Sequence, residues 1–210
     1  MTLERYVEVG KKRLRCGYTT GTCAAAAAQA CGQALLAGNF PHSLRIDTPA
    51  GIAVVVEPEE MHRGTDAQGT PWASCGVRKD AGDDADATDG ALVVVRVSLV
   101  NTPGTTIEGG AGVGRVTRAG LDQPVGAAAI NSVPRAMIAS ELERIAREHG
   151  WQGGFAVEVS VPGGEEIARK TFNPRLGIEG GISILGTSGI VRPMSEEALV
   201  ESIRLEMRMR

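Results

Sequence analysis

The stretch from Lys79 to Gly90 holds the densest group of side chains that could move a proton or hold a cation. Five aspartates lie within ten residues, from Asp80 to Asp89, and crowded carboxylates raise one another's pKa, which suits a general base. A calcium-binding EF-hand loop starting at Asp84 would need glycine at position 89, so that pattern fails. Three interpretations stay open: a solvated loop whose aspartates act as caps, a Mg²⁺ or Ca²⁺ site, and a functional loop that pairs with a cationic ligand or takes a proton.

A second candidate is the loop from Arg15 to Cys23, in which two glycines and three threonines precede the alanine run Ala24–Ala28. The strong helix formers predict a helix start, with Thr20 or Thr22 capping its first N–H groups. Because a helix N-terminus has unpaired donors and partial positive charge, it suits a carboxylate or a phosphate.

Glycines recur over residues 109–114, but the nucleotide-binding patterns fail there. A dinucleotide loop starting at Gly110 needs glycine where Arg115 stands, and one starting at Gly112 needs glycine where Thr117 stands. A P-loop fails as well, because Arg115 occupies the position of its lysine. Two interpretations stay open: a backbone nest for an anion beside Arg115, and a turn in a glycine-rich fold.

A further glycine-rich segment lies near the end of the chain. Gly180-Gly181 and the sequence Gly186-Thr187-Ser188-Gly189 flank a short apolar strand, and Arg175 and Arg192 lie nearby. Backbone N–H, hydroxyl and guanidinium groups acting together hold anionic groups well. The pattern therefore indicates another anion-binding loop.

Composition excludes several classes of protein. The 210-residue chain has a formal net charge of -3 and only 3% aromatic residues, so it lacks the basic field and the stacking rings of a nucleic-acid-binding protein. Its cysteines form no C-x-x-C pair, which argues against a zinc site and favours buried, reduced thiols. Polar residues interrupt the signal-peptide-like N-terminus, and no stretch approaches the ~20 apolar residues of a membrane span. We expect a cytoplasmic protein with no resident metal.

The elements that must position these loops follow no regular strand–helix–strand repeat, so we expect an α+β fold with a mixed sheet, packed helices and glycine-rich loops. The apolar run over residues 92–100 predicts the central strand. Pro49 to Gly51 predict a hairpin turn, and Pro134 and Gly150 bound a helix that starts at the caps Asn131 and Ser132. The other expected elements are a helix over 22–37 and extended segments over 43–48, 52–57, 72–77, 105–108, 155–161 and 167–172.

Ser195 marks the expected domain boundary. Residues 1–194 are interpreted as one substrate-binding α+β domain. A further helix is expected to start at Ser195, with acidic residues at the positive end of its dipole and no stop signal before Arg210. We interpret residues 195–210 as the start of a linker helix to a C-terminal α/β domain that this sequence does not contain.

Taken in order, these segments resemble the cobalt-precorrin-5B C(1)-methyltransferase family of anaerobic vitamin B12 biosynthesis. The likeness covers nearly the whole chain and is most specific near the end. Family members are considerably longer, so the resemblance implies an N-terminal domain that transfers methyl groups weakly or not at all by itself. The resemblance rests on Gly17–Ala24, Arg78–Asp80, Gly82–Asp84, Asp86–Thr88, Gly109–Thr117, Ala129–Asn131, Pro134-Arg135, Asn173, Arg175–Ile178 and Gly180–Ser195.

The resemblance implies transfer of a methyl group from S-adenosylmethionine to carbon 1 of cobalt-precorrin-5B, giving cobalt-precorrin-6A, with cobalt present only as part of the substrate. The precursor has many acetate and propionate arms, so we expect separate anion pockets to converge on one macrocycle. We expect these pockets to accelerate methyl transfer mainly by positioning the substrate. Asp83 or Asp84 is the hypothetical catalytic residue, either as a base or facing the sulfonium. The expected substrate-binding residues are Thr19, Thr20, Thr22, Lys79, Gly110, Gly112, Arg115, Asn173, Arg175, Ser183, Thr187 and Ser188.

Two other functions stay open. One is a nucleotide-binding or phosphoryl-transfer protein built on residues 109–114, which ATP binding would favour. The other is a corrinoid-binding or scaffolding domain that passes intermediates to other enzymes of the corrin pathway. Tight tetrapyrrole binding with no response to S-adenosylmethionine would favour the second.

Overall fold

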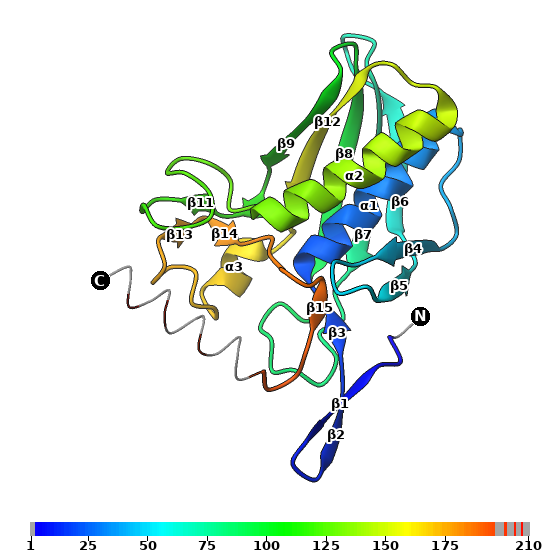
Figure 1. The fold of residues 1–210 in the computed structure, drawn as a ribbon. Helices are drawn as coiled ribbons and strands as arrows, with labels where there is room; N and C mark the ends of the chain where they lie inside the picture. Colours follow the sequence, from blue (N-terminus) through cyan, green and yellow to red (C-terminus); the bar gives the residue numbers. More distant parts are fainter. Residues whose placement is uncertain (1–2, 196–199, 201–203, 205–206, 208–210) are drawn as a thin grey trace.

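A five-stranded mixed sheet forms the body of the molecule, in the order β6-β7-β8-β12-β9. Helices α1 (Thr20–Leu36) and α2 (Ser132–His149) cross one face of it (Figure 1). This arrangement confirms the predicted α+β class. The strands of the sheet are β6 (Glu59–Thr65), β7 (Pro71–Arg78), β8 (Leu92–Val100), β9 (Gly104–Gly109) and β12 (Gly154–Ser160).

The remaining elements are short pairs at one end of the sheet and around it (Figure 1). Antiparallel pairing joins β1 to β2, β3 to β15, β4 to β5 and β11 to β13, whereas β10 and β14 pair in parallel. Their bounds are β1 (Tyr6–Val9), β2 (Lys12–Arg15), β3 (Gly17–Tyr18), β4 (Leu44–Asp47), β5 (Ala53–Val56), β10 (Gly112–Val113), β11 (Arg115–Val116), β13 (Ile178–Glu179), β14 (Gly181–Ile182), β15 (Ile190–Val191) and the helix α3 (Gly164–Ala168).

Strand β8 is the middle strand of the sheet, as its apolar run predicted. It pairs antiparallel with β7 and β12, while β12 runs parallel to β9. Val93, Val95 and Val97 are fully buried, since alternate residues of a strand point to one face and here that face is the core.

Helix α1 is buried along almost its whole length because it packs against both the sheet and α2. The alanines from Ala24 to Ala28 are all 0% exposed. A Cβ atom at Gly32 would lie 2.9 Å from a δ carbon of Leu142, so glycine lets the two helices approach closely without a shift of the Leu142 side chain. The small side chains therefore fix where the first turn of α1 lies.

Several elements differ from those expected, and the short strands β1, β2, β3, β10, β11, β13 and β15 were not predicted. Residues 164–168 form the short helix α3, although an extended segment had been predicted from residue 167 onwards. Gly163, just before the helix, adopts a left-handed φ of 74° that turns the chain into it. Strand β6 was not predicted, since it lies at the sheet edge, its residues are mostly exposed and polar, and it therefore shows no apolar alternation.

The structure is a computed structural model that describes residues 3–195 and, beyond them, the helical residues Val200, Arg204 and Met207. The predicted linker helix over residues 195–210 therefore lies largely outside the described residues. Within the described part of the chain, no helix is long and apolar enough to cross a membrane.

Candidate functional site

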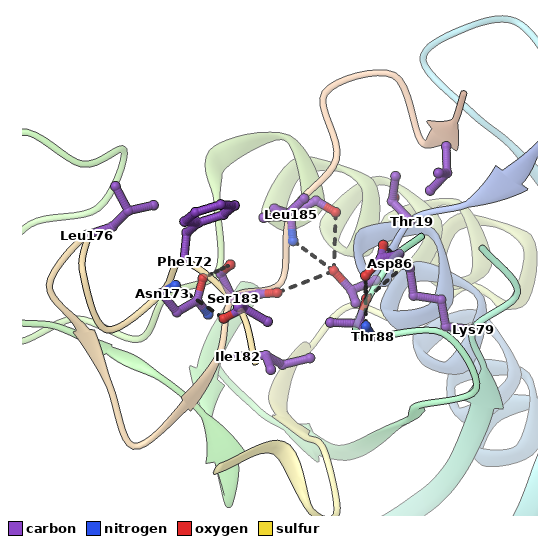
Figure 2. A pocket seen from close by; sticks show the side chains of 13 residues that line it. Thr19, Lys79, Asp86, Thr88, Phe172, Asn173, Leu176, Ile182, Ser183 and Leu185 are labelled. Carbon is purple, nitrogen blue, oxygen red and sulfur yellow. Dashed lines mark hydrogen bonds and ion pairs between the residues drawn. The ribbon is translucent and has the colours of Figure 1, made fainter. Parts of the chain in front are cut away.

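A cavity of about 230 Å³ lies where three segments distant in the sequence meet. These segments are the start of α1, the acidic loop after β7, and the chain on either side of β14. Figure 2 shows Lys79, Asp86 and Thr88 on one side of the cavity and Phe172, Asn173 and Leu176 on the other. The complete lining consists of Thr19, Thr20, Lys79, Asp86, Thr88, Thr171, Phe172, Asn173, Leu176, Ile182, Ser183, Leu185 and Val191.

The start of α1 is tied to the segment after β14. The N-cap is Thr19 and not Thr20 or Thr22 as predicted, and its Oγ1 accepts a hydrogen bond from the Thr22 amide at 3.2 Å. The Oγ1 of Thr20 accepts from the Leu185 amide at 3.0 Å, and the amide of Gly21 donates to the Leu185 carbonyl at 3.0 Å. These hydrogen-bonding groups are already paired inside the protein. The helix start therefore holds the cavity wall in place through them.

Each aspartate of the acidic loop has its own partner, which offsets their mutual repulsion. Asp80 forms a bidentate pair with the Arg15 guanidinium at 2.6 and 2.7 Å. Asp83 accepts from the Arg15 amide at 2.6 Å, Asp84 from the Met194 amide at 3.2 Å, and Asp89 from the Ala81 amide at 2.8 Å. Among the described residues, no group of three or more His, Cys, Asp or Glu side chains could hold a metal ion. The aspartates outside the cavity thus hold the loop together.

The remaining aspartate, Asp86, belongs to a polar cluster inside the cavity. The Lys79 side chain is only 2% exposed, and its Nζ donates to Asp86 and, at 2.8 Å, to Thr88 Oγ1. The other carboxylate oxygen of Asp86 accepts from the Thr88 amide at 2.7 Å and the Thr88 hydroxyl at 2.6 Å. Every member of the cluster therefore has a partner.

Burial alone would raise the pKa of Asp86, but the charge and hydrogen bond of Lys79 and the hydrogen bonds of Thr88 outweigh it and leave that pKa below its usual value. The hydrogen bond from Arg15 likewise lowers the pKa of Asp80. Both carboxylates are consequently ionised at neutral pH and are weak proton acceptors.

The opposite wall is rigid at its base and apolar at its mouth. Asn173 and Ser183 are buried, and the Ser183 hydroxyl donates to Asn173 Oδ1 at 3.4 Å. Phe172 is 60% exposed and Leu185 is 47% exposed, although both line the cavity. The guanidinium carbon of Arg175 lies 5.8 Å from the centre of the Phe172 ring. A neighbouring cavity shares Asn173, Leu176, Ser183 and Leu185 as a common wall.

The predicted site residues divide into two groups. Thr19, Thr20, Lys79, Asn173 and Ser183 come together in the cavity lining, as expected. The others lie outside that lining, so the expected convergence of all the loops is not observed. These are Thr22, Asp83, Asp84, Gly110, Gly112, Arg115, Arg175, Thr187 and Ser188.

The glycine-rich loop over residues 109–114 is a packing element. Gly112 has a φ of 73°, and a Cβ atom there would lie 1.9 Å from the Val161 carbonyl oxygen. The amides of Gly110 and Gly114 donate to the carbonyls of residues 159 and 182. With these donors used, the interpretation as a turn in a glycine-rich fold is favoured over an anion nest. Arg115, on the exposed side, donates to the Gly126 carbonyl at 3.1 Å.

The loop containing Thr187 and Ser188 also serves the fold. Ser188 bonds to Ile190 through its hydroxyl and to the Ala50 amide through its carbonyl, while Thr187 is exposed. The buried Thr22 hydroxyl donates to the Gly189 carbonyl at 2.7 Å. These contacts hold the β14–β15 connection against α1 and the β4–β5 hairpin.

Sequence reasoning missed Asp86, Thr88 and Phe172 as cavity residues. Asp86 and Thr88 lie within the motif that supports the family resemblance, but nothing local distinguishes them from Asp83 and Asp84. Phe172 had one detectable signal, because it is one of only three phenylalanines in the chain and stands next to polar residues.

Comparison with known proteins places the chain in a family. Residues 7–193 match the model of the CbiD family. The chain is 49% identical over 205 residues to a cobalt-precorrin-5B C(1)-methyltransferase of Ruminiclostridium cellulolyticum, covering 98% of this chain and 52% of that protein. A protein of the same name from Treponema denticola is 47% identical over 207 residues, with 99% of this chain and 55% of that protein covered.

A solved structure agrees with the sequence matches. The crystal structure of the cobalamin biosynthesis protein (cbiD) from Archaeoglobus fulgidus is similar, with a TM-score of 0.65 and 34% identity, covering 97% of this chain and 63% of the other. The chain spans about half the length of the curated relatives it matches. Since the family match extends over most of its residues, the chain belongs to the CbiD family.

Proposed function

We propose that this chain provides the corrinoid-binding part of a cobalt-precorrin-5B C(1)-methyltransferase. The proposed reaction transfers a methyl group from S-adenosylmethionine to carbon 1 of the macrocycle and gives cobalt-precorrin-6A. The names of relatives about half identical to this chain support the reaction. The observation that most supports a site in this chain is the cavity itself. It is built from Thr20, Lys79 and Ser183, which come from three separate parts of the family match.

The cavity residues suit recognition of the macrocycle edge. Thr20 accepts a hydrogen bond from the Leu185 amide, and Thr19 is held by a hydrogen bond to Thr22 within the start of α1, so the cavity keeps its shape before a ligand enters. The buried ammonium of Lys79 is fixed by Asp86 and Thr88, so its charge has a defined position. Such preorganised polar groups accelerate a displacement by holding the two reactants in line.

Among the acidic candidates, Asp86 is the one we assign to the reacting centre. Asp83 and Asp84 lie outside the cavity lining and each accepts a hydrogen bond from a backbone amide. Asp86 lies in the cavity and is ionised because of its partners Lys79 and Thr88. Its lowered pKa makes it a poor base, so its proposed role is electrostatic.

S-Adenosylmethionine, the implied donor, supplies a methyl group on a positively charged sulfur. An ionised carboxylate is the side chain that best matches such a cation, and Asp86, although it is paired with Lys79, is 26% exposed, so we assign to it the charged part of the donor. Asp86 would hold that charge near the opening, and the apolar residues Ile182 and Leu185 would keep water away from it.

A turnover assay tests the proposal. The chain alone and a fusion to the remaining half of the Ruminiclostridium cellulolyticum relative would each be incubated with cobalt-precorrin-5B and S-adenosylmethionine, and the product examined by mass spectrometry. We expect the fusion to add one methyl group and the chain alone to show weak or no transfer. The same fusion with Asp86→Asn should be slowed at least tenfold, whereas Asp47→Asn, an exposed carboxylate of β4, should have no effect.

Other outcomes would assign the chain elsewhere. A folded fusion that binds the corrinoid without any response to the methyl donor would favour a scaffolding domain. A fusion that binds ATP and no corrinoid would overturn the proposal altogether.

A further inference from the structure

The size of the cavity limits what can enter it. Pockets that enclose a drug-sized ligand measure roughly 300–1,000 Å³, and this one measures about 230 Å³. A corrinoid macrocycle with its side arms is larger than a drug-sized molecule. Only one edge of such a ring fits inside, and the rest must lie on the surface around the mouth.

The surface at the mouth is apolar and exposed. Phe172 and Leu185, at 60% and 47% exposure, line the cavity and also face solvent. Figure 2 shows both side chains among the residues that line the cavity. Phe172 is the most exposed of the three phenylalanines, and the flat face of its ring is suited to stacking on a conjugated ring.

A cation lies beside this apolar surface. The Arg175 guanidinium stacks on the Phe172 ring, and it has no ion-pair partner within the part of the chain that the structure describes. Backbone hydrogen bonds hold both residues in one turn, including the Arg175 amide to the Phe172 carbonyl at 3.0 Å. By contrast, Lys79 inside the cavity is already neutralised by Asp86.

We infer that the corrinoid ring lies outside the cavity against Phe172 and Leu185, with one edge entering the cavity and one carboxylate arm paired with Arg175. This inference rests on the proposed function and extends it to a substrate class: macrocycles whose arm at this position is a free carboxylic acid. Amidated or esterified arms lack the charge that Arg175 matches.

Titration of the 210-residue chain with two cobalt corrins tests the inference. One corrin has free carboxylate arms and the other has the same arms methylated to esters. Binding is followed by the change in corrin absorbance. Phe172→Ala should weaken binding of both corrins about tenfold, the loss expected from one stacking contact. Arg175→Gln should weaken binding of the free acid up to about fivefold and leave the ester unchanged.

The chain provides a matched control pair. In the β1–β2 hairpin, Arg13 stacks on Tyr6 at 4.2 Å, and Tyr6 is 42% exposed, so the same type of contact occurs away from the cavity. Tyr6→Ala and Arg13→Gln should bind both corrins as the unaltered chain does.

The outcomes separate this inference from the proposed function. If the unaltered chain binds the corrins and Phe172→Ala and Arg175→Gln bind them equally well, the ring lies elsewhere and the inference is overturned, while the proposed function stands. If the unaltered chain binds neither corrin, a corrinoid site in this chain is overturned together with the inference. An Arg175→Gln effect of the same size on acid and ester would also contradict the assigned ion pair.

Discussion

Replacing Asp86 by asparagine tests whether the cavity depends on the ion pair with Lys79. The Lys79 side chain is 2% exposed and that of Asp86 26%, so the substitution leaves a nearly buried ammonium with Thr88 as its remaining partner. Removing one member of a buried pair costs about 3–5 kcal/mol. Because Asp86 is partly exposed, we expect about 3 kcal/mol, at the lower end of that range.

The reverse substitution and the double variant complete a cycle. Lys79→Met leaves a more exposed carboxylate that keeps its two hydrogen bonds from Thr88, so we expect a smaller loss of about 2 kcal/mol. The double variant removes both charges and should lose about 3 kcal/mol, not the sum of about 5 kcal/mol. The difference of about 2 kcal/mol is the coupling between the two residues.

Urea unfolding followed by tryptophan fluorescence measures these losses, with the denaturant dependence checked to be unchanged. Asp47→Asn serves as the control, since the Arg45–Asp47 pair is 70% and 76% exposed and should change stability by less than about 0.5 kcal/mol. Single variants of the Lys79–Asp86 pair that behave like this control, or a double variant with additive loss, would show that the ion pair does not stabilise the cavity.

Three further predictions follow from the structure. The fold lowers the pKa values of Asp80 and Asp86, so their stabilising contribution is complete at pH values above the pKa of an unfolded aspartate, ~4, and is lost on acidification. The urea concentration at the midpoint of unfolding should therefore decrease when the pH is lowered below about 4, and it should decrease less in Asp86→Asn. Gly112→Ala should lower the free energy of unfolding by more than about 2 kcal/mol in a urea titration, because the new Cβ meets a carbonyl oxygen at 1.9 Å. Gly180 has a similar left-handed φ but open space around it, so Gly180→Ala should cost about 1 kcal/mol. Equal losses in the two variants would contradict this prediction. Burial raises the pKa of the Cys23 thiol to about 12, so iodoacetamide at pH 8 should alkylate Cys23 only after the chain unfolds. Rapid labelling of this thiol in the folded chain would contradict the prediction.

The fold could be predicted where local chemistry decides it. The valines of β8, the turn at Gly51 and the left-handed Gly150 after α2 each leave a direct pattern in the sequence, and the structure has these features where they were expected. Strand β6 could not be found in this way, because an exposed edge strand has no apolar periodicity.

The site was predictable only in part, because its residues are selected by packing at long range. Thr20 meets Leu185 across 165 positions, and family resemblance alone indicated that these segments belong together. The role of Gly112 depends on the backbone that passes beside it, which a local motif does not specify. The choice of Asp86 over its neighbours likewise depends on which loop position faces Lys79.

The cavity with Phe172 at its mouth is the proposed corrinoid site. Crystals of the chain grown with a cobalt corrin test it most directly, because anomalous scattering at the cobalt edge locates the metal centre of the ring. We expect the cobalt peak above the mouth of the cavity, next to Phe172 and Leu185. A peak over another surface, such as the groove between Thr48 and Met137, would contradict it.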